Sequence, residues 1–145
     1  MNKKKLVCTL LALALLLSLA ACAAFADDAV MDVYWIGKTL NNPWWISVAD
    51  FATQEAEALG VNLTIAIPQE EVDLERQVSM IEAAVQSGAK ALVISAASSD
   101  GVAPAIQAAR EAGLKIVNFD TRINDKSLVD AAFIEHEKEV RLAAA

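Results

Sequence analysis

The chain has 145 residues, of which 12 are basic and 19 acidic, giving a net charge of −7. Three lysines lie within the first five residues, so the rest of the chain has a net charge of −10, which argues against nucleic acid as a partner because phosphate binding needs a basic face. Both cysteines, Cys8 and Cys22, lie in the N-terminal apolar stretch, so the part that folds has no thiol for a disulfide, a metal site or a nucleophile.

Residues 1–26 have the three parts of an export signal, namely lysines, an apolar run and small residues. Two cleavage sites compete. The stretch LAAC resembles the lipobox of bacterial lipoproteins and would make Cys22 the lipidated first residue, whereas Ala24-Phe25-Ala26 fits cleavage before Asp27. We expect cleavage rather than a retained anchor, because the alanine-rich end of the run inserts weakly into a bilayer. The protein is therefore predicted in the periplasm or at the outer face of the cell membrane.

A β-strand is predicted from Met31 to Gly37, followed by the stretch TLNNPWW, Thr39 to Trp45. Asn42 is a natural N-cap, and Pro43 fits the first helical position because the missing amide hydrogen would have no partner there. A helix is therefore predicted to begin directly above the first strand.

Trp44 and Trp45 then fall in the first helical turn, where side chains lean back toward the helix start. One interpretation places both indoles at the mouth of a crevice. The other is core packing, since Trp44 leads an apolar series at helical spacing: Val48, Phe51, Ala52, Ala56 and Leu59. Consecutive residues point about 100° apart on a helix, so two adjacent tryptophans are hard to bury together.

The next part of the chain repeats one pattern, in which a helix end, a glycine and an apolar β-rich run follow one another. Gly60, Gly88 and Gly113 occupy the position where a helix ends in a left-handed conformation. The predicted strands after the first are 61–67, 91–95, 115–119 and 129–134. Several are continuously apolar, as expected for a parallel sheet covered on both faces.

Two further helices are predicted between these strands. Asp73 can cap the first, which has apolar residues at helical spacing, and Asp100 can cap the second, with Pro104 tolerated near its first turn. Alternating strands and helices predict an α/β fold, a doubly wound parallel sheet of about five strands with helices on both faces.

Ligands of such sheets bind beyond the carboxyl ends of the strands, which selects the loops 38–45, 95–100 and 120–126. Asp120 could accept hydrogen bonds from two ligand hydroxyls and Arg122 could donate in return. An Asx-turn is an equally good interpretation of Asp120, and a solvated surface position somewhat better than a ligand contact for Arg122. Ser95 is a weaker candidate, because serine is common in such loops.

Taken together, these residues resemble the bacterial ribose-type periplasmic sugar-binding proteins, the solute receptors of ABC importers. TLNNPWW is similar to that family's Asn-Pro-aromatic-aromatic loop, the stretch 77–99 to its second helix, third strand and polar loop, and VNFDTR to its strand ending in Asp. FIEHEKEVRLAAA is similar to its next strand and the start of a helix. The similarity covers nearly all of the chain after the export signal.

The resemblance implies a role for each matching residue. Asn42 would bind ligand hydroxyls, Trp44 and Trp45 would stack on the sugar ring, Asp120 would accept paired hydroxyls, and Ser95 would be a polar contact. The chain departs from the family in having Thr121 between Asp120 and Arg122, where members often have Arg directly after Asp; Thr121 and Arg122 are both kept as expected ligand contacts. It also has His136-Glu137 where an Asp-Asn pair is common, which puts the identity of the ligand in doubt.

Family members have two lobes, and this chain ends about where the first would lead into the second. Residues 27–145 are therefore predicted to be the N-terminal lobe, apparently truncated, of a protein that captures a sugar or sugar-like ligand for an ABC permease, without catalysis, cofactor or metal. One alternative is a receptor lobe feeding a chemoreceptor or sensor kinase. A less favoured one is an exported flavodoxin-like enzyme, since the chain has no nucleophile elbow, Walker loop or dinucleotide fingerprint.

Overall fold

The computed structural model describes residues 30–70, 73–133 and 141–142. The predicted export signal with Cys22, and the pair His136-Glu137, lie outside the described residues. No helix within the described ranges is both long and apolar enough to cross a membrane.

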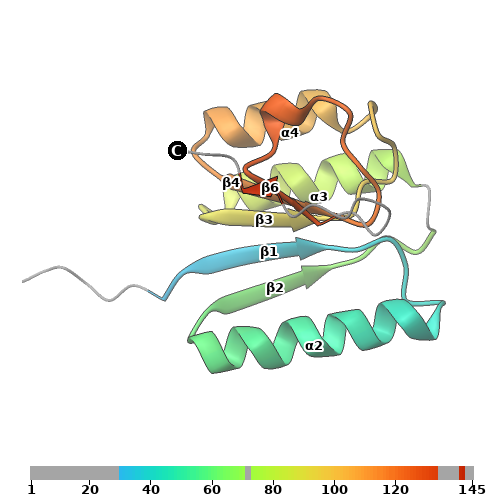
Figure 1. Ribbon diagram of the computed structural model, residues 1–145, viewed down its shortest axis with the longest axis vertical. Coiled ribbons are helices and arrows are strands. Elements are labelled where there is room, and N and C mark those ends of the chain that lie inside the picture. Colours follow the sequence, from blue (N-terminus) through green and yellow to red (C-terminus); the bar gives the residue numbers. More distant parts are fainter. Residues whose placement is uncertain (1–29, 71–72, 134–140, 143–145) are drawn as a thin grey trace, which may run out of the picture.

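Strands and helices alternate along the chain (Figure 1). The strands are β1 (Asp32–Ile36), β2 (Asn62–Ala66), β3 (Ala91–Ile94), β4 (Lys115–Phe119), β5 (Ala131–Phe133) and β6 (Arg141–Leu142). The helices are α2 (Pro43–Leu59), α3 (Leu74–Gln86), α4 (Ala103–Glu111) and the short 3-10 helix η1 (Lys126–Leu128).

The sheet has the order β2-β1-β3-β4-β5-β6. Strands β1 to β5 are parallel, and the short β6 pairs antiparallel with β5. The predicted α/β fold with about five parallel strands is confirmed. The fifth strand was predicted over 129–134. In the structure it starts later, at Ala131, and is described to Phe133; Ile134 lies outside the described residues.

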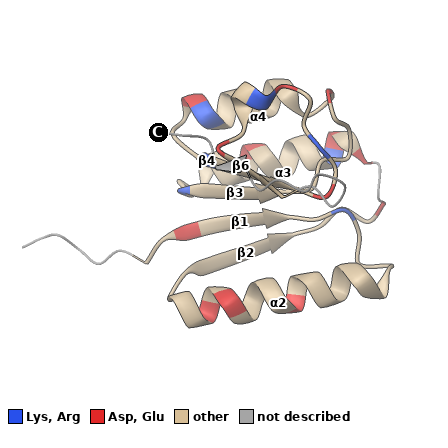
Figure 2. Ribbon diagram, viewed as in Figure 1, with Lys and Arg blue, Asp and Glu red and all other residues tan. Residues whose placement is uncertain are grey.

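Helices cover both faces of this sheet, α2 on one side and α3 with α4 on the other (Figure 1). The larger core lies under α3 and α4 and includes the fully buried Ile81, Leu92 and Ile116. A smaller aromatic core lies under α2 around Trp35 and Trp45. In β1 and β4 only the first residue, Asp32 and Lys115, is charged, and β3 has no charged residue (Figure 2), as expected for strands whose middle residues are packed on both sides.

Two of the three predicted N-cap residues cap their helices in the structure. Asn42 and Asp73 cap α2 and α3 by accepting hydrogen bonds from backbone amides, as predicted. The prediction for Asp100 was wrong, because α4 starts later, with Val102 at the N-cap and no side-chain cap. Asp100 instead accepts a 2.9 Å hydrogen bond from Asn124 and so ties the loop after β3 to the loop after β4.

Each helix-to-strand joint turns at a glycine in the left-handed region. The φ angles of Gly60, Gly88 and Gly113 are 67°, 77° and 97°. A side chain would strain this backbone conformation, so the recurring glycine in the sequence has a direct conformational cause.

The start of β4 is held by a carboxylate on the segment before β5. Asp130 Oδ2 accepts 2.8 Å hydrogen bonds from the Ile116 amide and from the Arg110 guanidinium. The Lys115 ammonium lies 3.5 Å from Oδ1 of the same carboxylate. Burial by itself would raise the pKa of Asp130, but the bond from Ile116 and the charges of Arg110 and Lys115 outweigh it and lower the pKa.

We expect this carboxylate to make the fold sensitive to acid. A lowered native pKa stabilises the fold above the unfolded-state value of about 3.9, and the contribution is lost as the pH falls through the native value. At neutral pH, Asp130→Ala should lower the free energy of unfolding by about 1–3 kcal/mol, because the Ile116 amide loses its acceptor. Urea denaturation at pH 7 and pH 3 measures this, and a difference between variant and parent that stays constant with pH would contradict it.

Candidate functional site

The carboxyl ends of β1, β3 and β4 open at one edge of the sheet. The chain leaves β1 for β2 on one side and later returns to place β3 on the other side of β1. The strand order therefore reverses between β1 and β3, which is where ligands bind in open α/β sheets. The loops after β1, β3 and β4 meet at this edge, as predicted.

In the loop after β1, several polar residues have structural partners. Thr39 is buried, and its hydroxyl accepts a hydrogen bond from the Asn41 amide. The Asn41 side chain donates to the Gln69 carbonyl in the loop after β2. The Asn42 side-chain oxygen accepts from the Trp44 amide at 2.9 Å, which caps α2. These bonds fix the angle at which α2 leaves the sheet edge.

The two tryptophans have different environments. Trp45 is 3% exposed and packs at edge-on geometry against Trp35 and Phe119, with ring centroids 6.3 and 5.9 Å away. Trp44 is 46% exposed and touches only the edge of this cluster, with its ring centroid 4.7 Å from that of Trp45. The expectation that both indoles lie at the mouth was therefore wrong for Trp45, and the core interpretation was wrong for Trp44.

Asp120 is the centre of the polar part of the site. One of its carboxylate oxygens, Oδ2, accepts a 2.9 Å hydrogen bond from Ser95 and a 3.1 Å bond from Thr121, and it lies 3.0 Å from the Lys38 ammonium. These partners come from the ends of three different strands. Oδ1 receives none of these three contacts, so it is the oxygen through which Asp120 can accept from a ligand.

The backbone and the charge of Asp120 are both unusual. Its φ angle is 57°, in the left-handed region, which aspartate tolerates better than most residues. Burial would raise the pKa of its carboxyl, but the hydrogen bonds from Lys38, Ser95 and Thr121 and the charge of Lys38 outweigh it and lower the pKa. Asp120 is therefore a carboxylate at neutral pH and a strong hydrogen-bond acceptor.

Lys38 is a residue that sequence analysis missed. Its side chain is 17% exposed, donates to the Thr121 hydroxyl and lies 6.0 Å from the Trp45 ring centroid. Its position directly after the first strand was the available signal. Arg122, the cation expected beside Asp120, is half-buried in the same loop.

Two buried amide side chains hold the loops of this site in place. Asn118 donates to the Ile94 and Thr121 carbonyls at 3.0 and 2.9 Å. Gln77, on α3, donates to the Ser95 carbonyl at 2.9 Å and accepts from the Ala97 amide at 2.7 Å. A polar residue on an apolar helix face was the signal for Gln77.

We expect Gln77→Leu to destabilise the lobe by about 2 kcal/mol or more, because the Ser95 carbonyl and the Ala97 amide lose the side chain that binds them while volume is kept. Gln107→Leu is a matched control, since Gln107 is exposed on α4, and should change stability by less than about 0.5 kcal/mol. Chemical denaturation measures both. Equal effects would show that the buried amide contributes nothing specific.

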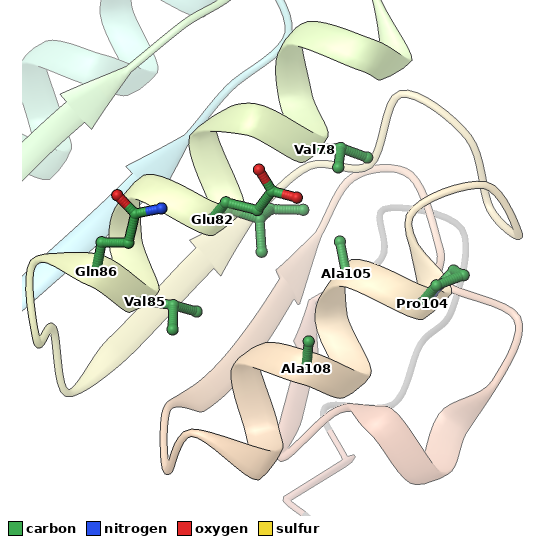
Figure 3. Close-up of a pocket in the computed structure, with 8 residues that line it drawn as sticks. Val78, Glu82, Val85, Gln86, Pro104, Ala105 and Ala108 are labelled. Carbon is green, nitrogen blue, oxygen red and sulfur yellow. The ribbon is translucent and has the colours of Figure 1, made fainter.

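A separate groove lies between α3 and α4 (Figure 3). It has a volume of about 380 Å³ and is lined by Val78, Ile81, Glu82, Val85, Gln86, Pro104, Ala105 and Ala108. None of these residues belongs to the three loops, and the lining offers few polar groups. We assign no function to this groove. The described residues also contain no cluster of three metal-ligating side chains.

Comparison with known proteins identifies the family. Residues 33–138 match the periplasmic binding protein domain family. The chain is 30% identical to the ribose import binding protein of Escherichia coli (strain K12) over 129 residues, 89% of this chain and 42% of the relative. It is 31% identical to the D-allose-binding periplasmic protein of the same organism over 117 residues, 81% of this chain and 36% of the relative.

Solved structures agree. A periplasmic solute-binding protein of an ABC transporter from Actinobacillus succinogenes 130z, with bound D-allose, superposes with a TM-score of 0.63 at 26% identity. The match covers 67% of this chain and 34% of that chain. The chain thus spans less than half the length of these relatives. With the family match, the parallel sheet and the placement of its loops in agreement, the chain belongs to the periplasmic binding protein domain family.

Proposed function

We propose that the chain forms the N-terminal lobe of an exported binding protein that captures a monosaccharide for an ABC importer, without catalysis. The observation that carries this proposal is that the helix start with an exposed indole, Trp44, and the loop with a carboxylate, Asp120, both follow strands at the same edge of the sheet. A sugar presents polarised C–H groups to an aromatic face and hydroxyls to a carboxylate, so this pair suits both sides of a sugar ring.

Each residue then has a distinct role. Trp44 stacks on the ring, and Asp120 accepts ligand hydroxyls through Oδ1. The side-chain oxygen of Asn42 is used in capping α2, so Asn42 contributes its NH₂ group as a donor. Ser95 is fully buried and donates to Asp120, so it positions this carboxylate rather than contacting the ligand. The half-buried Thr121 also gives its hydroxyl hydrogen to Asp120 and therefore meets a ligand as an acceptor.

Two further residues that were predicted to contact the ligand differ in their proposed roles. Trp45 is buried, so we propose that it supports Trp44 and Lys38 from below rather than stacking on the ligand. Arg122 follows Thr121 in the same loop, and we propose that its guanidinium donates hydrogen bonds to the ligand at the rim of the site.

The relatives indicate the class of ligand. They are named for ribose and D-allose, and the solved structure holds D-allose. A cyclic pentose or hexose is therefore the proposed ligand class.

We further propose that residues 1–26 are the export signal and that residues 27–145 supply one wall of a two-lobed site. Support comes from the 42% coverage of the ribose relative. One wall binds weakly, because closure around a ligand normally supplies the remaining contacts. Cys22 would be lipidated if cleavage occurs before it, and the permease would be the partner at the membrane.

A thermal-shift panel tests the function. Pentoses, hexoses and polyols are added to the processed chain and to a version extended by the downstream reading frame. We expect the extended form to be stabilised by about 2.7 kcal/mol at a sugar concentration one hundred times the dissociation constant, and the single lobe much less. If no sugar stabilises either form, the sugar assignment is wrong.

A further inference from the structure

The face of the sheet on the side of α2 is only partly covered. Within β3 and β4, residues that point toward α3 and α4, such as Leu92 and Ile116, are fully buried. Successive residues of a strand point to opposite faces, and those on the α2 side of the same strands, Val93 and Val117, are only half-buried. Phe133, on the same side of β5, is 49% exposed. Among the described helices, α2 alone lies on this side (Figure 1), and the strand it contacts most is β2, at the edge of the sheet.

Helix α2 has an apolar row beside the row that it buries on the sheet. Val48, Phe51 and Leu59 recur at helical spacing. Val48 packs on the aromatic core under α2, whereas Phe51 and Leu59 are 65% and 74% exposed. The crossover from a strand through a helix to a parallel strand is right-handed, which turns this row toward β3 rather than toward the free edge of β2. We call the resulting apolar surface the open face, and it consists of Val48, Phe51, Leu59, Val93, Val117 and Phe133.

The open face has opposite charges near one end. Helix α2 contains three acidic residues and no basic one, and one of the acidic residues, Glu55, lies in the apolar row. Lys115, the first residue of β4, lies on the α2 side of the sheet, and its side chain is 76% exposed. Both residues lie toward the sheet edge at which the strands begin, because α2 ends at Leu59, just before β2 starts.

A second copy of the chain fits this surface. A helix with an apolar row is what covers a sheet face in α/β folds, and α2 of a second copy supplies one. A two-fold axis parallel to the strands places the two α2 helices side by side, each over β3 to β5 of the other copy, so that the same patch is used twice. This axis keeps the two edges at which the strands begin together, so Glu55 of each copy approaches Lys115 of the other.

The size of the open face agrees with a weak dimer. A large aromatic side chain buries roughly 150–250 Å², so at these exposures Phe51, Leu59 and Phe133 offer roughly 350 Å² per copy. Two copies offer about 700 Å², and the half-buried valines and the charged rim bring the total to about 1,000 Å², the lower bound for a specific interface. Trp44 is not counted, because it lies at the ligand edge.

We propose that the open face is the interface of a homodimer of this chain, in which α2 of each copy covers β3 to β5 of the other and Glu55 pairs with Lys115 across the interface. The small area implies a dissociation constant in the micromolar range. The dimer does not depend on sugar binding, because the loops after β1, β3 and β4 lie at the other end of the strands.

Analytical ultracentrifugation of the processed chain, from low micromolar to several hundred micromolar concentration, tests the proposal. The parent should change from monomer to dimer over this range. Phe51→Ser should raise the dissociation constant of the dimer about tenfold or more, because each dimer loses two buried rings. Ile46→Ser is the matched control, since Ile46 is 44% exposed on another flank of the same helix, and it should leave the dimer unchanged. Thermal melting followed by circular dichroism checks that both variants stay folded.

A charge exchange between copies tests the pairing itself. Glu55→Lys and Lys115→Glu should each weaken their own homodimer, since each places like charges across the interface. An equal mixture of the two variants should recover the association of the parent, because both charge contacts of the mixed dimer then join opposite charges. Loss of the contact between Lys115 and Asp130 within one copy cannot produce this recovery. Glu57→Lys, on another flank of α2, should neither weaken the dimer nor rescue Lys115→Glu.

Three results would overturn the proposal. The first is a processed chain that stays monomeric up to several hundred micromolar. The second is equal association of the parent, Phe51→Ser and Ile46→Ser. The third is an extended form that stays monomeric while the processed chain dimerises, because a downstream segment would then occupy the open face in place of a second copy.

Discussion

Trp45→Ala should lower the free energy of unfolding by about 3–5 kcal/mol, the range for truncating a buried large aromatic side chain. Trp45 is 3% exposed and contacts Trp35, Phe119 and Trp44. Its removal leaves a cavity beneath the start of α2 and takes away several aromatic contacts at once. Chemical denaturation followed by circular dichroism measures the effect.

Trp44→Ala is the matched comparison on the neighbouring residue. Since Trp44 is 46% exposed, we expect a stability loss of about 1 kcal/mol or less. In the extended form, sugar affinity should fall roughly tenfold, because the stacking surface is lost. If the two variants lower the melting temperature equally and neither changes binding, the division between a core indole and a ligand-facing indole is wrong.

Asp120→Asn should produce the largest loss of sugar binding, about 10- to 100-fold in the dissociation constant, since a hydrogen bond to a charged group contributes about 1.5–3 kcal/mol. Asparagine also tolerates a left-handed backbone, so the φ angle of 57° should be retained. The lobe should therefore stay folded while the carboxylate and its pairing with Lys38 are lost.

Calorimetric titration of the extended form with D-ribose or D-allose measures this loss. Asp50→Asn serves as its control, because Asp50 is an exposed aspartate on α2 whose charge should not matter for binding. Unchanged affinity in Asp120→Asn would remove this carboxylate from the ligand site and leave it an organiser of the loop.

Much of the fold follows from local patterns. The positive φ angles of Gly60, Gly88 and Gly113 match the predicted helix ends, because glycine alone takes that conformation without a steric cost. The caps at Asn42 and Asp73 are equally local, since each side chain bonds an amide two or three residues further on. The predicted cap at Asp100 was wrong, because its side chain accepts a hydrogen bond from Asn124 on another loop instead of from an amide of α4.

Neighbouring residues in one helix show where local patterns end. The sequence by itself determined that Trp44 and Trp45 occupy the first turn of a helix above β1. Only the packing of α2 on the sheet decided which indole is buried, because residues about 100° apart on a helix point in different directions and the sequence does not show which one faces the sheet.

The polar site depends on the tertiary structure even more. The sequence by itself determined that Ser95 and Asp120 end two strands of a parallel sheet and so lie at one edge. The hydrogen bond from Lys38 joins residues 83 positions apart, and no periodicity carries information over that distance. The tertiary structure alone decided that a lysine after β1 meets a carboxylate after β4. In the sheet only one strand, β3, separates β1 from β4, and the long side chain of Lys38 spans that distance.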